Sequence, residues 1–142
     1  MTRVSRYTAS FDGEFFLHIE AEAPGAGRVP DDEILEGPPL RVTRIGAEVI
    51  LTWSASCLSS DTDFSVYAGP MTNYGLHEPI TCTTTGLLQH RFLPPSGDNY
   101  FIVVPHNGVK EGSHGTRNLG LGPIERLPSP AVCYPQDVAA CP

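Results

Sequence analysis

One stretch of the sequence, residues 92–105, constrains the fold more than any other. It begins with a turn rich in proline and glycine and continues into the most apolar strand of the chain. Tyr100 stands at the start of that strand, shortly after Leu93 and Gly97. A tyrosine in this place marks a corner where the chain passes from one sheet of a β-sandwich to the other, and its hydroxyl can bond to backbone upstream. We therefore expect Tyr100, Leu93 and Gly97 to belong to the framework of a sandwich.

The composition indicates short strands joined by many turns. The 142 residues are 40% hydrophobic and 18% charged, and they include 14 glycines and 14 prolines. A chain of this length buries about 68–70% of its unfolded surface, which is enough for a core. The formal charge of −7 argues against a nucleic-acid partner, because nucleic-acid binding needs clustered basic residues. The sequence contains no run of 18 apolar residues, so we expect no membrane insertion.

The N-terminal segment predicts a β-hairpin. Residues 7–11 and 14–20 alternate, and Asp12-Gly13 between them is a strong signal for a two-residue hairpin loop. The segment is either the last hairpin of a preceding domain or a pair of added strands that pack on the sandwich or pair with a neighbouring copy. We divide the chain into a hairpin at 1–28, a linker at 29–37, a sandwich at 38–128 and a Cys/Pro-rich tail at 129–142.

Strands from residue 40 onwards follow at the spacing of an all-β sandwich. The alternation in residues 48–53 places Val49, Leu51 and Trp53 on one face, which predicts a core tryptophan. Phe64 and Val66 take the inner face of the next strand. Residues 100–104 are apolar on both faces, which predicts a central strand. The expected fold is an antiparallel β-sandwich with an extra N-terminal β-hairpin.

These residues resemble a fibronectin type III domain over roughly Pro38 to Pro128. Five motifs carry a narrower likeness: Thr52-Trp53-x-Ala55-Ser56-Cys57, Asp63-Phe64-x-Val66-Tyr67, His77-x-Pro79-x-x-Cys82, Gly97-Asp98-x-Tyr100-Phe101-x-Val103-Val104-Pro105 and Glu111-Gly112-Ser113. They resemble fibronectin III-like modules near the C-terminal ends of large secreted bacterial proteins. The resemblance implies a sandwich of the fibronectin III or immunoglobulin type that acts as a non-catalytic spacer or accessory domain. His114 departs from it, since an aromatic residue is expected there, and the hairpin lies outside it.

The four cysteines, Cys57, Cys82, Cys133 and Cys141, indicate disulfides. They are even in number and none forms a Cys-x-x-Cys pair, which would suggest zinc or thioredoxin-like chemistry. Our preferred pairing joins Cys57 to Cys82 and Cys133 to Cys141, and the other two connectivities stay open. Disulfides favour an extracellular or secreted location over the cytosol. Residues 1–25 lack the pattern of a signal peptide, so we expect this chain to be a piece of a longer exported protein.

Metal binding and catalysis are weakly indicated. No two of the five histidines and four cysteines have the close spacing of a zinc site. The acidic loop at Asp61 and Asp63, together with Asp98 or Glu111, is a modest candidate for calcium binding. Ser113 and His114 are adjacent, but neighbours on an extended chain point to opposite faces. We expect no catalytic residue, no metal and no cofactor.

Several polar and aromatic residues fall in predicted loops and are candidates for contact with a partner. They are Asn73, Tyr74, His77, Asn107, His114 and Arg117. We expect a spacer or protein-interaction module whose partner is a protein or glycan at the cell surface. The alternatives are a carbohydrate- or surface-binding module, which would need exposed coplanar aromatic rings, and an extracellular subunit that self-associates through the hairpin.

Overall fold

The computed structural model describes residues 3–11, 15–22, 24–32, 34–118, 120 and 122–142, with the backbone alone described in the first two ranges and at residues 117, 118 and 123. All regular secondary structure in these residues is β-strand, which confirms the all-β class. None of these residues lies in a helix that could cross a membrane.

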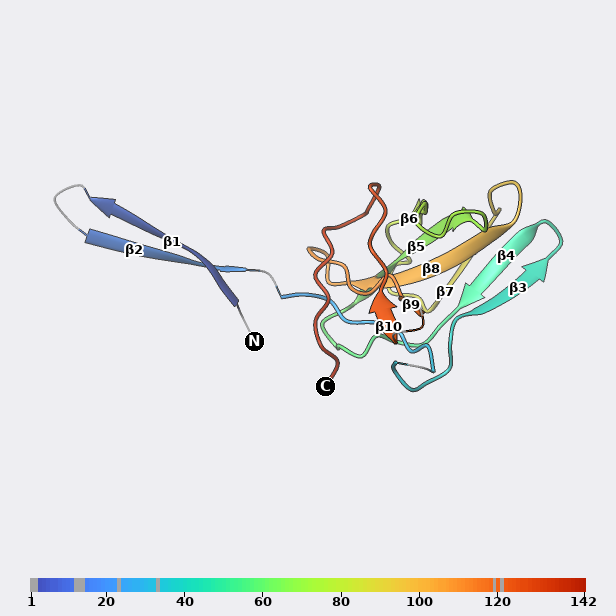
Figure 1. Ribbon diagram of the computed structural model, residues 1–142, viewed down its shortest axis with the longest axis horizontal. Coiled ribbons are helices and arrows are strands. Elements are labelled where there is room, and N and C mark those ends of the chain that lie inside the picture. Colours follow the sequence, from blue (N-terminus) through green and yellow to red (C-terminus); the bar gives the residue numbers. More distant parts are fainter. Residues whose placement is uncertain (1–2, 12–14, 23, 33, 119, 121) are drawn as a thin grey trace.

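Two antiparallel three-stranded sheets form the sandwich (Figure 1). The first has the order β3-β4-β7, with β3 at Arg41–Ile45, β4 at Glu48–Thr52 and β7 at Gln89–Phe92. The second has the order β6-β5-β8, with β6 at Glu78–Thr81, β5 at Asp63–Pro70 and β8 at Asn99–His106. The chain passes from the first sheet to the second between β7 and β8, as the proline-glycine corner predicts.

The core between the sheets follows the predicted alternation. Val49, Leu51 and Trp53 are buried, and they pack with Phe64, Val66 and Val103 of the facing sheet. The rings of Trp53 and Phe64 meet edge to face at 5.6 Å between centroids. Trp53 is 6% exposed, so its predicted place in the core is confirmed.

The second face of β8 is buried for a reason that differs from the prediction. β5 is the central strand of its sheet, and β8 lies beside it with β6 on the other side. Ile102 and Val104 form a second apolar cluster with Tyr67, against which Cys133 packs. The C-terminal segment therefore acts as a third layer, and this layer, rather than a central position, explains why β8 is apolar on both faces.

The Tyr100 hydroxyl bonds to backbone upstream, as predicted, at the carbonyl oxygen of Asn73 at 3.4 Å, while Asn99 holds the corner itself. Asn99 Nδ2 donates to the carbonyl oxygens of Pro95 at 2.8 Å and Gly97 at 3.0 Å. Gly97 has a φ of 88°, which glycine adopts without strain. Leu93 is 68% exposed, so its predicted framework role is wrong: it follows the last core residue of β7 and points to solvent.

The predicted N-terminal hairpin is present as β1 (Arg3–Phe11) and β2 (Phe15–Glu22), although its Asp12-Gly13 turn lies outside the described residues. Figure 1 shows the hairpin projecting from one end of the sandwich. Its register pairs Tyr7 with Ile19, Ala9 with Leu17 and Phe11 with Phe15. A further short hairpin that the sequence did not predict joins β9 (Thr116–Asn118) to β10 (Pro123–Glu125).

Residues 24–28, which the sequence analysis grouped with the hairpin, bond to the sandwich. The Ala26 amide donates to Asp137 at 2.9 Å, and the Ser113 amide donates to the carbonyl of Gly27 at 2.9 Å. Gly112 allows this approach, because a Cβ atom there would lie 1.8 Å from the Gly27 oxygen. The tail returns along the same segment, where the amide of Ala139 donates to Ala26.

All four cysteines form disulfides, but the preferred pairing was wrong. Cys57 bonds to Cys141, and Cys82 bonds to Cys133. The prediction joined cysteines near one another in the sequence. The backbone bonds of residues 24–28 to the tail bring Cys141 to Cys57, whose own amide donates to the carbonyl of Arg28. The third layer likewise carries Cys133 across the second sheet to the loop after β6.

Candidate functional site

A continuous set of hydrogen bonds between buried and half-buried polar side chains lies between the second sheet and the C-terminal layer. Tyr67 comes from β5 and Tyr100 from β8, while His77 precedes β6. Glu111 and His114 follow β8 in a segment bonded to residues 27 and 135. We call these five residues, Tyr67, His77, Tyr100, Glu111 and His114, the polar chain.

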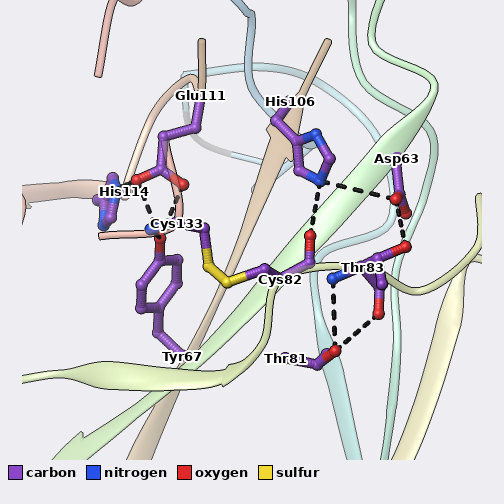
Figure 2. The surroundings of a disulfide bond; sticks show 9 residues. All are labelled: Asp63, Tyr67, Thr81, Cys82, Thr83, His106, Glu111, His114 and Cys133. Atoms are coloured by element: carbon purple, nitrogen blue, oxygen red, sulfur yellow. Dashed lines mark hydrogen bonds and ion pairs between the residues drawn. A yellow bond between two sulfur atoms is a disulfide. The ribbon is translucent and has the colours of Figure 1, made fainter. Parts of the chain in front are cut away.

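Tyr67 and Glu111 form the inner end of the polar chain. Both side chains are 0% exposed, and the Tyr67 hydroxyl lies 2.7 and 2.9 Å from the two carboxylate oxygens of Glu111. The same hydroxyl accepts a hydrogen bond from the Cys133 amide at 2.9 Å. Figure 2 shows this contact beside the Cys82–Cys133 disulfide. The polar chain therefore fixes the segment that carries the disulfide.

The two histidines, His77 and His114, continue the polar chain outward from Glu111. Glu111 Oε1 accepts from His114 Nε2 at 2.9 Å. The other ring nitrogen of His114, Nδ1, lies 3.0 Å from His77 Nε2. His77 Nδ1 lies 3.2 Å from the Tyr100 hydroxyl, which also donates to the Asn73 carbonyl oxygen at 3.4 Å. Every ring nitrogen of the two histidines therefore has a hydrogen-bond partner.

Burial perturbs several members of the polar chain. Burial, together with the smaller effects of the nearby His114 and Arg126, lowers the pKa of His77 to about 4. Burial also raises the pKa of Tyr67 above its usual value, and Glu111 adds to the rise. Burial raises the pKa of Tyr100, against the opposing effect of Arg126. Burial thus keeps His77 neutral and both tyrosines protonated near pH 7.

A second polar centre, at Asp63 and His106, lies on the other side of the same disulfide (Figure 2). Asp63 Oδ1 accepts from the amides of Phe64, Thr84 and Gly86 at 2.8, 2.9 and 3.1 Å. Burial alone would raise the pKa of Asp63, but its hydrogen bonds outweigh burial and lower the pKa to about 2. His106 Nε2 donates to the Cys82 carbonyl at 2.9 Å.

The structure separates the predicted partner-binding residues into two groups. His77 and His114 are buried in the polar chain, so their predicted place on a loop surface is wrong. Tyr74 is 53% exposed, and Asn73 is exposed with its side chain capping the amide of Gly75. Asn107 Nδ2 donates to the carbonyl of Pro24 in the N-terminal segment, and Asn107 Oδ1 accepts from the amides of residues 109 and 110 in its own loop. The side chain of Arg117 lies outside the described residues.

Tyr74 belongs to a small aromatic cluster at the surface. Its ring lies 5.2 Å from that of Tyr100 with 47° between the planes, and the Arg126 guanidinium lies within 6 Å of both rings. Arg126 Nη1 also donates to the Tyr74 carbonyl at 3.0 Å. The rings are tilted rather than coplanar.

The residues considered for metal binding and catalysis are engaged elsewhere. Asp61 accepts from the Gly27 amide at 2.8 Å and from Ser56, so it holds the N-terminal segment. Ser113 Oγ donates to Glu125 at 2.6 Å rather than to His114. Among the described side chains, no group of three or more His, Cys, Asp or Glu residues is arranged to hold a metal ion.

The sequence did not predict the inner end of the polar chain, at Tyr67 and Glu111. The alternation in β5 that places Phe64 and Val66 inward also places Tyr67 on the opposite face, which would have been an indication that this face is covered. Nothing in the sequence pairs Tyr67 with Glu111, which is 44 residues away.

Comparisons with protein-family models, curated proteins and solved structures return no significant match to this chain.

Proposed function

We propose that this chain is a non-enzymatic, fibronectin III-like module of a secreted or surface protein, where it serves as a spacer or a protein-interaction unit. The observation that carries the proposal is the pair of disulfides that tie the C-terminal layer to the sandwich. Disulfides persist in oxidising compartments and are rare in the cytosol, so they support an extracellular location. The resemblance to modules of secreted bacterial proteins points in the same direction.

The state of the buried polar groups supports a structural role. Glu111, His77 and His114 are buried, and their partners are one another, Tyr67 and Tyr100. Groups satisfied in this way fix a unique packing. Their arrangement favours a stable scaffold over a reaction centre.

Localisation and thiol state test this proposal together. Cells producing the native protein are separated into cytoplasmic and extracytoplasmic fractions, and the thiols are alkylated before lysis. The proposal predicts an extracytoplasmic chain with no alkylated cysteine. A cytoplasmic chain with four alkylated cysteines would contradict it.

Self-association is the second candidate function, and the isolated hairpin favours it over carbohydrate binding. A two-stranded hairpin alone is marginally stable in water, so we expect β1 and β2 to pack against a further partner. Carbohydrate binding would need exposed coplanar rings, whereas Trp53 is buried and Tyr74 is tilted against Tyr100. Sedimentation of the full oxidised chain over a range of concentrations tests self-association, and a Leu17→Asp/Ile19→Asp variant is expected to remain monomeric.

A further inference from the structure

We infer that the β3 edge of the sandwich receives strand β2 of a second copy of this chain. This inference rests on the second proposed function, self-association, and names the surface that the hairpin contacts. The added strand would extend the sheet β3-β4-β7 at its β3 end, as in other cases of recognition by strand addition.

The backbone edge of β3 is open to a further strand. β3 stands at the end of its sheet, with β4 as its single strand neighbour in the described part of the chain. All five of its residues are exposed. An exposed edge strand presents unpaired backbone groups and is a template for pairing with another chain.

The inner face of β3 is also uncovered. Val42 is paired with Leu51, which is 0% exposed in the core, yet Val42 itself is 56% exposed. An open groove of about 480 Å³ lies beside it, and its lining includes the apolar Val49, Met71 and Phe101 and the polar Arg44, Asp98 and Asn99. The sandwich is therefore incomplete at this edge, and a further strand with apolar residues at alternate positions would cover it.

Strand β2 has the sequence pattern that this edge requires. Its alternate positions Phe15, Leu17, Ile19 and Ala21 are apolar, and the intervening set is Phe16 followed by the polar His18, Glu20 and Glu22. β2 is paired with β1 on one side alone in the described residues, so its other edge is open to pairing. Placing the apolar set over the groove puts the acidic set on the outer face.

Charge complementarity with β3 favours β2 over β1 as the added strand. The outer face of β3 carries Arg41, because Arg41 alternates with the inward Val42. β1 carries Arg3 and Arg6, which would repel Arg41, whereas the glutamates of β2 attract it. Opposite charges on neighbouring strands stabilise pairing, and like charges destabilise it.

The positions of the two surfaces favour a head-to-tail assembly. Figure 1 shows the hairpin at one end of the molecule and β3 at the other. A hairpin at one end therefore cannot reach the β3 edge of its own chain in this arrangement. Contacts between unlike surfaces produce rings or open chains of subunits rather than closed two-fold dimers.

A charge exchange in the full oxidised chain tests this inference by sedimentation. The Arg41→Glu variant makes the receiving edge acidic, and the Glu20→Arg/Glu22→Arg variant makes the donated strand basic. Each variant alone is expected to weaken self-association about tenfold, and a mixture of the two is expected to restore it, since each donated strand then meets an edge of opposite charge. Lys110→Glu changes the charge equally in a loop, and it is expected to leave association unchanged.

Hydrogen exchange on the same samples identifies the pairing edge. At concentrations where the chain associates, the amides of residues 41–45 are expected to become protected together with those of residues 15–22. Protection in the hairpin alone, with association unchanged in Arg41→Glu, would mean that hairpins pair with one another. That result overturns the inference and leaves self-association standing. A wild-type chain that is monomeric at every concentration would overturn both.

Discussion

The Nε2 atom of His77 lies 3.0 Å from the Nδ1 atom of His114, and neither residue is more than 1% exposed. Two imidazoles this close and this buried cannot both carry a charge without strong repulsion. The contact therefore makes the stability of the fold sensitive to acid.

Stability is predicted to fall as the pH drops from about 6.5 to about 4. The pKa of His77 is about 4 in the folded chain, below its ordinary value of 6.5, so in this range the unfolded chain binds a proton that the folded chain does not. The loss approaches about 3 kcal/mol at the acidic end. Denaturant unfolding at a series of pH values measures it. A His77 ring resonance that titrates near 6.5 in the folded protein would refute this account.

A second acid transition is expected from Asp63. Its pKa is lowered to about 2 by hydrogen bonds, so its contribution is complete above about 4 and is lost as the pH falls through about 2. Asp63→Asn is expected to cost about 2 kcal/mol at pH 7 and to remove this transition while leaving the His77 transition in place. If Asp63→Asn leaves the acid unfolding curve below pH 4 unchanged, the assignment fails.

Glu111→Gln is predicted to destabilise the fold by about 2–4 kcal/mol. The amide group of glutamine replaces an accepting oxygen with a donor at a place where Tyr67 and His114 already donate. Glu48→Gln is the matched control, because Glu48 forms an exposed ion pair with Arg91 and is expected to cost less than about 1 kcal/mol. Urea unfolding at pH 7 compares the two variants. Equal losses would show that the polar chain does not stabilise the fold.

Gly112→Ala tests the contact between the N-terminal segment and the sandwich. The added Cβ atom would collide with the Gly27 oxygen, so backbone must move, and we expect a loss of about 3 kcal/mol. Gly108→Ala is the control: it has open space and a φ of 86°, so strain alone is expected to cost about 1 kcal/mol. Thermal unfolding ranks the two, and a Gly108 variant as unstable as the Gly112 variant would contradict the packing.

The sequence predicted the parts of the fold that depend on local alternation and on turns. The faces of β4, β5 and β8 follow from the period of two, as do the core positions of Trp53 and Phe64, and Asp12-Gly13 indicated the hairpin. The change of sheet between β7 and β8 followed from the proline-glycine corner.

The polar chain and the disulfide pairing could not be predicted because both depend on where the tail lies. Cys57 and Cys141 are 84 residues apart, and Tyr67 and Glu111 are 44 apart. Their meeting depends on a third layer that has almost no regular secondary structure, so no periodic pattern marks it. His77 and His114 lie in segments with loop composition, and composition does not show that a segment is covered by another.

The most direct test of the account is a peptide map of the oxidised, non-reduced protein, since the proposed module depends on a C-terminal layer bonded to the sandwich. Closure of loops of 84 and 51 residues stabilises the folded state by roughly 4 kcal/mol each in the loop-entropy model, and the nested loops make the sum smaller than twice that value. The account predicts peptides that join Cys57 to Cys141 and Cys82 to Cys133. Peptides that join Cys57 to Cys82, or four free thiols, would contradict it.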